Sequence, residues 1–427
     1  MRAAGSAGRY PREVTTASSP LRIALVSLHT SPGAEPGSGD VGGMNVVVRN
    51  QAEALGAAGH HVDIVTRRSD PAQPASLDLS PGVTLHYLTA GPPEPVTKGR
   101  HELFVTEFRD RLAELGPWDV VHSHHWFSGM AALPVARALG VPHVQSFHSI
   151  AAADSTPLSH GERAESPGRL AGEVHLAQQS DAVVAISRAE AETVTTRLGG
   201  RPDRVAVVLP GVDSELFHPV DPAEEARIDS PARPSVVVAG RLEPLKAPDL
   251  AIRAVAAVPA DVRPDLVIAG GASTEFAGYE DDLLALVGEL DLTVRFVGPR
   301  TRTGLASLLR DASLVLVPSH SETYGLIALE AAASGVPVVA AASGGLRESV
   351  VDGVTGVVLE SRDPGDWATT ITRILRDGEL ASRLSRASRA RALDHPWSLS
   401  AAELADVYCR VSGSEDCTEL VAVGGRR

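Results

Sequence analysis

The sequence alternates strand, turn and helix in two successive series, and few folds accommodate this pattern. In the first series the apolar run LRIALVSL at residues 21–28 precedes a glycine-rich loop, a helical segment from Gly43 and the strand-like HVDIVTR. Further apolar runs follow at VTLHYL, WDVVHSHH, PHVQSFHS, DAVVAIS and RVAVVLPG. Such alternation predicts a mostly parallel sheet covered by helices on both faces.

A second series of the same kind begins at PSVVVAGR and continues to TGVVLE. Between the two series, the segment FHPVDPAEEARIDSPARP contains four prolines and no apolar periodicity, which is typical of an interdomain linker. We therefore expect two doubly wound α/β domains that face a shared crevice. The predicted limits are a disordered extension at 1–20, domains at 21–217 and 218–396, a C-terminal helix at 397–411 that crosses back to the first domain, and a flexible tail at 412–427.

Composition excludes several classes of function. The formal net charge of −14 argues against a protein that binds nucleic acid or an anionic membrane through its general field. No apolar segment approaches the ~20 residues of a membrane span, and the N-terminus lacks the apolar core of a signal peptide, so we expect a cytoplasmic protein. The two cysteines are too few for a four-ligand zinc site.

Glycines at Gly37, Gly39 and Gly42 follow the GxGxxG spacing of a dinucleotide site, with Asp63 expected at the end of the next strand. A nicotinamide-dependent dehydrogenase is one interpretation. However, a loop separates these glycines from the strand that ends near Leu28, whereas a dinucleotide fold turns directly from strand into glycine. We expect instead that Gly42 and Gly43 let the backbone approach a ligand at a helix N-terminus; a turn without a ligand is the alternative.

Two cations follow the first strand of the second series. Arg241 comes directly after it and Lys246 lies at the start of the next helix. Only two of the 39 basic residues are lysines, Lys98 and Lys246. Two fixed cations at the carboxyl end of a strand suit an anion with several oxygens, such as a diphosphate. A solvated surface pair is the alternative interpretation.

The segment SETYGLIALEAAASG places Glu322 before a predicted helix and Glu330 inside it. We expect one carboxylate to bind a sugar and the other a ribose, while the N–H groups of Tyr324, Gly325 and Leu326 face a phosphate. The alternative is a capping charge at Glu322 and a solvent-facing Glu330.

Other catalytic chemistry finds little support. His122, His124 and His125 lie close together in the sequence, but in a strand the first two share a face and the third points away, so we predict no metal site. We find no Ser/His/Asp triad and no cysteine nucleophile.

Several of these segments together resemble the retaining, GT-B-fold glycosyltransferases of family 4. The resemblance rests on GRLEPLKAP, the E-x7-E pattern of SETYGLIALE, GVPVVAAASGGLRESVVDGVTG, LPGVDSELFHP and GDVGGMNV, and runs from Leu21 to Tyr408. Within the family, SLHTSPGAEPGSGDVGGMNVVV and VVHSHHWFSG are most similar to the mycothiol-pathway enzymes that transfer N-acetylglucosamine from UDP to inositol 3-phosphate.

The resemblance implies a nucleotide-sugar donor, front-face transfer with retention, and no metal or other cofactor. It assigns the donor diphosphate to Arg241 and Lys246, with Gly43 donating a backbone N–H. It assigns the ribose to Glu330 and the transferred sugar to Glu322 and His148; a buried strand histidine is the alternative for His148.

For the acceptor, the resemblance implies a site formed by Asn45, Lys98, His125, Ser149 and Arg169. Two positions depart from the inositol phosphate enzymes: His125 replaces a tyrosine and Ser149 a threonine. The segment AAADSTPL also lacks a basic run. Inositol 3-phosphate therefore stays open as the acceptor beside an aminocyclitol or a thiol, with UDP or GDP in the donor.

Two classes other than a transferase stay open beside the dehydrogenase. A non-hydrolysing nucleotide-sugar epimerase would share the two domains and the diphosphate site, and a silent sugar-binding protein would share the fold without turnover. The partners expected are a nucleotide sugar and a small polar acceptor, and whether the chain forms a homodimer is left open.

Overall fold

The computed structural model describes residues 20–36, 41–220, 233–272 and 274–413. Almost all of the predicted N-terminal extension and C-terminal tail, most of the predicted linker, and both Gly37 and Gly39 lie outside these residues.

The N-terminal half forms one sheet with the strand order β10-β9-β6-β5-β1-β2-β4-β3. Its strands are β1 (Arg22–Ser27), β2 (His61–Arg67), β3 (Ser76–Ser80), β4 (Val83–Leu88), β5 (Val120–His124), β6 (His143–Ser146), β9 (Ala182–Ala185) and β10 (Val205–Val207). All paired strands are parallel except β3, which runs antiparallel to β4 at the edge. The sequence pattern predicted the parallel strands but not β3, whose short SLDLS segment is mostly exposed.

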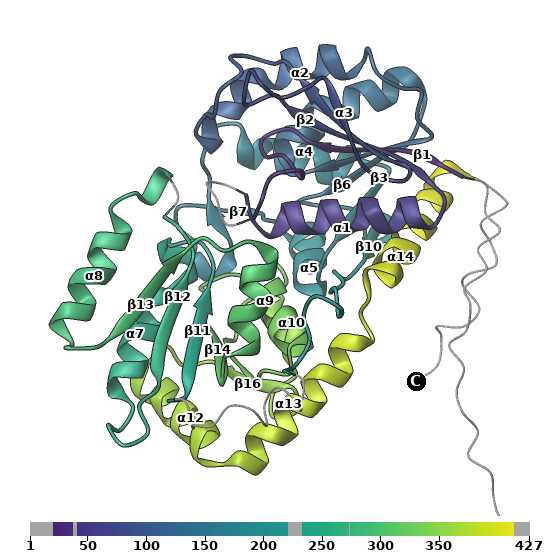
Figure 1. Cartoon of the computed structure of the whole chain (residues 1–427). Helices are drawn as coiled ribbons and strands as arrows, with labels where there is room; N and C mark the ends of the chain where they lie inside the picture. Colours follow the sequence, from purple (N-terminus) through teal and green to yellow (C-terminus); the bar gives the residue numbers. More distant parts are fainter. Residues whose placement is uncertain (1–19, 37–40, 221–232, 273, 414–427) are drawn as a thin grey trace, which may run out of the picture.

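The second half forms a parallel sheet in the order β13-β12-β11-β14-β15-β16. Its strands are β11 (Ser235–Ala239), β12 (Asp265–Ala269), β13 (Val294–Gly298), β14 (Leu314–Val317), β15 (Val338–Ala341) and β16 (Gly356–Leu359). The strands that follow β11 in the sequence lie first on one side of it and then, from β14 onward, on the other. The first strand of a dinucleotide-binding fold has the same central position. The prediction of two doubly wound α/β domains is confirmed (Figure 1).

Helices cover both faces of each sheet, which explains why the strands are continuous apolar runs. In β11, Val236 and Val238 pack in one core cluster and Val237 packs in the cluster on the opposite face.

The helices of the first half are α1 (Gly43–Ala57), α2 (Val105–Leu112), α3 (Trp126–Leu139), α4 (Arg169–Gln179) and α5 (Arg188–Thr196). Those of the second are α7 (Pro248–Ala257), α8 (Tyr279–Glu289), α9 (Arg302–Arg310), α10 (Leu326–Ala333), α11 (Leu346–Ser349), α12 (Pro364–Arg376) and α13 (Gly378–Leu393). In the described part of the chain, no helix combines the length and the apolar character needed to cross a bilayer.

The last helix, α14 (Trp397–Ser412), crosses back from the second half and packs beside α1 (Figure 1). Leu404, Val407 and Tyr408 join the apolar core beneath the first sheet. The Tyr408 hydroxyl lies 2.7 Å from Nδ1 of His122 in β5, and both residues are fully buried. The C-terminal helix that the sequence predicted to cross back is therefore confirmed, and it ties the two halves together at the sheet core.

Replacing Tyr408 with phenylalanine removes this buried hydrogen bond and keeps the ring. We expect Tyr408→Phe to lower the free energy of unfolding by about 1–2 kcal/mol, because the His122 nitrogen loses a buried partner. Urea unfolding followed by circular dichroism measures the change. Tyr279→Phe, which removes a partly buried hydrogen bond to Asp249, is the matched control and should cost less. If Tyr408→Phe lowered the free energy of unfolding by no more than Tyr279→Phe does, the assignment of a stabilising bond to His122 would be wrong.

Candidate functional site

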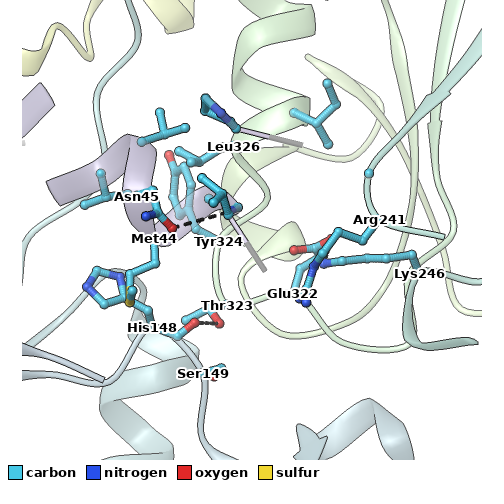
Figure 2. Close-up of a pocket in the computed structure, with 18 of the residues that line it drawn as sticks. Met44, Asn45, His148, Ser149, Arg241, Lys246, Glu322, Thr323, Tyr324 and Leu326 are labelled. Atoms are coloured by element: carbon cyan, nitrogen blue, oxygen red, sulfur yellow. Dashed lines mark hydrogen bonds and ion pairs between the residues drawn. The ribbon is translucent and has the colours of Figure 1, made fainter. Parts of the chain in front are cut away.

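The carboxyl ends of the two sheets face one cavity of about 310 Å³. The cavity is lined by residues that follow β1, β5 and β6 in the first half and β11 and β14 in the second. Figure 2 shows how side chains from both halves point into this space. The sequence-predicted residues that line it are Gly42, Gly43, Asn45, Lys98, His125, His148, Ser149, Arg241, Lys246, Glu322, Tyr324, Gly325, Leu326 and Glu330.

The glycine loop opens onto the cavity at the start of α1. A Cβ at Gly42 would meet no atom within 4 Å, and one at Gly43 would lie 3.4 Å from Leu326 of the other half. Asn45 holds this turn in place: its Oδ1 accepts the Gly42 N–H at 3.3 Å and its Nδ2 donates to the Thr30 hydroxyl at 3.0 Å. The loop therefore leaves space for a ligand at the positive end of a helix.

Asp63 does not complete a dinucleotide site. It lies within β2 and not at its carboxyl end as expected, because the strand continues to Arg67. Its carboxylate accepts a hydrogen bond from Trp118 at 2.8 Å and lies 2.9 Å from Nε2 of His86. The expected position of Asp63 was wrong, and its polar atoms serve the structure of the first sheet.

The two predicted phosphate cations each lie beside a carboxylate. Lys246, at the end of the short 3-10 helix η4 (Pro244–Lys246), places Nζ 2.7 Å from Oε1 of Glu322. Arg241 places Nη2 3.2 Å from Glu243. Both cationic side chains keep 22% of their surface exposed. The interpretation of a solvated surface pair is wrong, because both cations lie in the cavity wall.

The helix α10 begins at the cavity with Gly325, which has a φ of 96°. A Cβ there would lie 2.5 Å from Leu346, so only glycine fits this turn. The side chain of Glu330, one turn into α10, is 6% exposed and forms an ion pair with Arg302 of α9. A solvent-facing Glu330 is therefore excluded. Sequence reasoning missed Arg302, whose only signal is its place just after β13.

His148 follows β6 with a φ of 60°, a conformation that few residues other than glycine and asparagine adopt. Its Nε2 lies 2.8 Å from Nδ1 of His124, and its Nδ1 has no hydrogen-bond partner among the described residues. Its carbonyl oxygen accepts a hydrogen bond of 2.5 Å from the Thr323 hydroxyl. This bond joins the two halves beside the cavity.

The histidine cluster is arranged as the sequence predicted. The rings of His122 and His124 lie on one side with centroids 4.2 Å apart, while His125 turns toward His29. Among residues that the structure describes, no three His, Cys, Asp or Glu side chains are grouped to hold a metal ion. Burial lowers the pKa of His148 to about 3 and holds that of His125 well below its ordinary value, so both imidazoles are neutral at pH 7.

The predicted acceptor residues divide into two groups. Lys98 and Ser149 line the cavity, but Arg169 does not: its side chain is fully buried and bonds to Glu165 and Glu173. Between Arg169 and the cavity lies Glu162, which sequence reasoning missed because no motif contains it.

The low pKa of His148 predicts a pH dependence. Since the unfolded imidazole binds a proton near pH 6.5 and the folded one only near pH 3, the free energy of unfolding falls as the pH drops through this window. Asparagine tolerates a positive φ, so His148→Asn should fold and flatten this slope between pH 6 and 4 by up to about 1.4 kcal/mol per pH unit. Denaturant titrations at several pH values measure it, with His160→Asn at an exposed site as control. An unchanged slope would show that His148 is not desolvated.

A model of "Family 4 Glycosyltransferase in conflict systems" matches residues 34–404 of the chain. The D-inositol 3-phosphate glycosyltransferase of Stackebrandtia nassauensis is 40% identical, over 91% of both chains. The enzyme of the same name from Mycobacterium bovis is 38% identical, over all of this chain and 93% of the relative.

Solved structures show the same two-domain fold. Sucrose-phosphate synthase from Thermosynechococcus elongatus superimposes with a TM-score of 0.83 at 28% identity, covering 92% of this chain and 99% of that one. Anabaena HepE, solved with UDP and glucose, gives a TM-score of 0.71 at 20% identity, covering 91% and 100%. The chain is therefore a glycosyltransferase of family 4 with the GT-B fold.

Proposed function

We propose that the chain transfers a sugar, with retention, from a nucleoside diphosphate sugar to a small cyclitol-like acceptor. The observation that carries the proposal is the arrangement of the cavity. Arg241, Lys246 and the N-terminus of α10 line the cavity from the second half, and Lys98 and Ser149 line it from the first. A diphosphate bound by the second half thus faces an acceptor bound by the first.

The donor groups are assigned by their chemistry. Arg241 and Lys246 bind the diphosphate, turning from their present carboxylate partners, and the N–H groups at the start of α10 and at Gly43 add hydrogen bonds. Glu330, which Arg302 holds in place, accepts the ribose hydroxyls. Glu322 accepts hydroxyls of the transferred sugar.

His148 completes the site for the transferred sugar. Its unpartnered Nδ1 and neutral ring suit a hydrogen bond to a sugar hydroxyl.

In the proposed reaction the bond between the anomeric carbon and the phosphate oxygen breaks, and the acceptor oxygen bonds to the same face of that carbon. The acceptor proton passes to the departing phosphate oxygen, so no enzymic nucleophile is required. Arg241 and Lys246 stabilise the negative charge that develops on the leaving diphosphate. We propose that these fixed cations serve in place of a metal ion.

Two acceptors have support from different observations. The names of the relatives that are 38–40% identical support inositol 3-phosphate. The carboxylate of Glu162, which lies between Lys98 and Arg169, favours an acceptor without a phosphate.

A product assay by mass spectrometry and NMR tests the proposal, because mass alone does not distinguish anomers or epimers. The full chain is incubated in EDTA with UDP-N-acetylglucosamine, UDP-glucose or a GDP-sugar, and with inositol 3-phosphate, inositol, an aminocyclitol or a small thiol. We expect one donor and one acceptor class to give a glycoside with the anomeric configuration of the donor. A product formed without acceptor would indicate an epimerase instead, and donor binding without any product would indicate a silent binding protein.

The two lysines offer a matched pair of variants. Lys246→Met should lower kcat by about 10²-fold or more, because it removes a cation that stabilises the leaving group, while Glu322 keeps its hydrogen bond from Ser319 at 2.9 Å. Lys98→Met removes the same charge from the part of the cavity formed by the first half and should raise mainly the acceptor KM. Steady-state kinetics separate the two effects, and melting curves check the fold. Equal effects of both variants on kcat would contradict the assignment of the donor diphosphate to the second half and of the acceptor to the first.

A further inference from the structure

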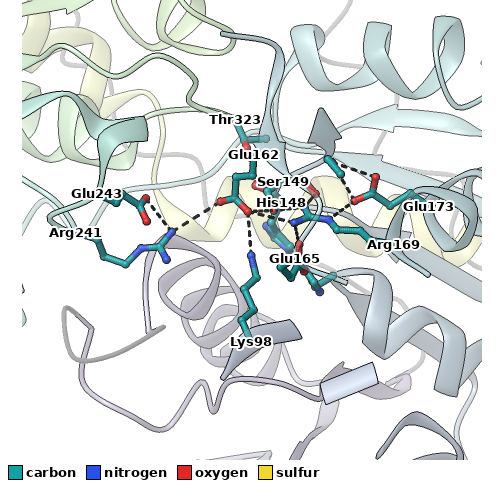
Figure 3. A network of polar contacts seen from close by, with 12 residues as sticks. Lys98, His148, Ser149, Glu162, Glu165, Arg169, Glu173, Arg241, Glu243 and Thr323 are labelled. Carbon is teal, nitrogen blue, oxygen red and sulfur yellow. Dashed lines mark hydrogen bonds and ion pairs between the residues drawn. The ribbon is translucent and has the colours of Figure 1, made fainter. Parts of the chain in front are cut away.

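Glu162 is the first residue of the short strand β8 (Glu162–Arg163), which pairs with β7 (Ala151–Ala152) at the acceptor end of the cavity. Its Oε2 lies 2.9 Å from Lys98 Nζ, 3.3 Å from Ser149 Oγ and 3.4 Å from Arg169 Nη1 (Figure 3). Its Oε1 lies 3.8 Å from Arg241 Nη2. One carboxylate of the chain thus occupies the point where these donors converge.

Arg169 has no donor left for a ligand in this arrangement. Its Nε bonds to Glu173 at 2.8 Å, its Nη1 to Glu165, and its Nη2 to the Ser149 carbonyl and hydroxyl oxygens at 3.3 and 3.0 Å. The side chain has no exposed surface. Arg169 therefore orients Glu162 and Ser149 and does not itself face the acceptor.

The charge at this end of the cavity is unfavourable for a phosphate. Three cations, Lys98, Arg169 and Arg241, meet four carboxylates, Glu162, Glu165, Glu173 and Glu243. Burial alone would raise the pKa of Glu162, but the charges of Lys98, Arg169 and Arg241 outweigh it and hold that pKa well below its ordinary value. A phosphate dianion would have to displace an ionised Glu162, whereas an ammonium group would compensate the excess negative charge.

We propose that Glu162 selects an unphosphorylated, amine-bearing cyclitol as the acceptor, by accepting hydrogen bonds from its ammonium and hydroxyl groups. This inference rests on the proposed function and names the acceptor class of the same site. An ionised carboxylate only accepts hydrogen bonds, so it matches a ligand that presents donors and disfavours one that presents phosphate oxygens. Ser149 and the neutral His125 complete the contacts with hydroxyl groups.

The test compares scyllo-inosamine, which carries one amine on the cyclitol ring, with inositol 3-phosphate. The full chain is assayed for glycoside formation from each acceptor, with the nucleotide sugar from which it releases UDP or GDP. Binding of each acceptor is measured by calorimetry in the presence of that nucleotide. We expect kcat/KM and affinity to favour scyllo-inosamine by at least about tenfold. Glu162→Gln, which removes one negative charge beside Lys98, should reduce this preference by about tenfold or more.

Glu53→Gln is the matched control, because Glu53 pairs with Arg49 on α1 and does not line the cavity. We expect it to change the preference by no more than about twofold. A wild-type preference for inositol 3-phosphate, in kinetics or in binding, would overturn this inference and leave the proposed function intact. Failure to glycosylate either acceptor despite nucleotide binding would overturn this inference, and it would refute the proposed function only if inositol and the thiol also gave no product. The comparison of the two acceptors with the unmodified chain tests this inference even if Glu162→Gln does not fold.

Discussion

The site depends on one geometric constraint: two parallel sheets must present their carboxyl ends to the same cavity. Parallel strands concentrate their ligand-binding loops at one edge, so each half alone offers only half of a site. The helix α14 satisfies the constraint by crossing back and burying Tyr408 against His122 in β5. The bond between Thr323 and the His148 carbonyl closes the same interface at the cavity.

Paired charges line the cavity. Lys246 lies beside Glu322, Arg302 beside Glu330, and Lys98 beside Glu162. Such pairing lowers the cost of holding cations in a partly buried wall. In the proposed function, the donor diphosphate replaces these carboxylates as the partner of Arg241 and Lys246. In the proposed acceptor site, the Glu162 carboxylate itself is the group that recognises the ligand.

The fold and most of the site could be predicted from sequence because both depend on local signals. Apolar runs buried on both faces marked the parallel strands, and the positions directly after β11 and before α10 identified Arg241 and Glu322. Glu162 could not be found in this way, because its role arises from three cations that approach it from separate segments. For the same reason the burial of Arg169 was missed: only tertiary packing places Glu165 and Glu173 around it.

Hydrogen–deuterium exchange with saturating UDP, or GDP where UDP does not bind, tests most directly whether the second half carries the donor. The account predicts slower exchange in the segments 240–246 and 319–330 and at the start of α1, with little change in segment 162–173 until an acceptor is added. Protection of the segment 162–173 by the nucleotide alone, with none at 240–246 and 319–330, would contradict it.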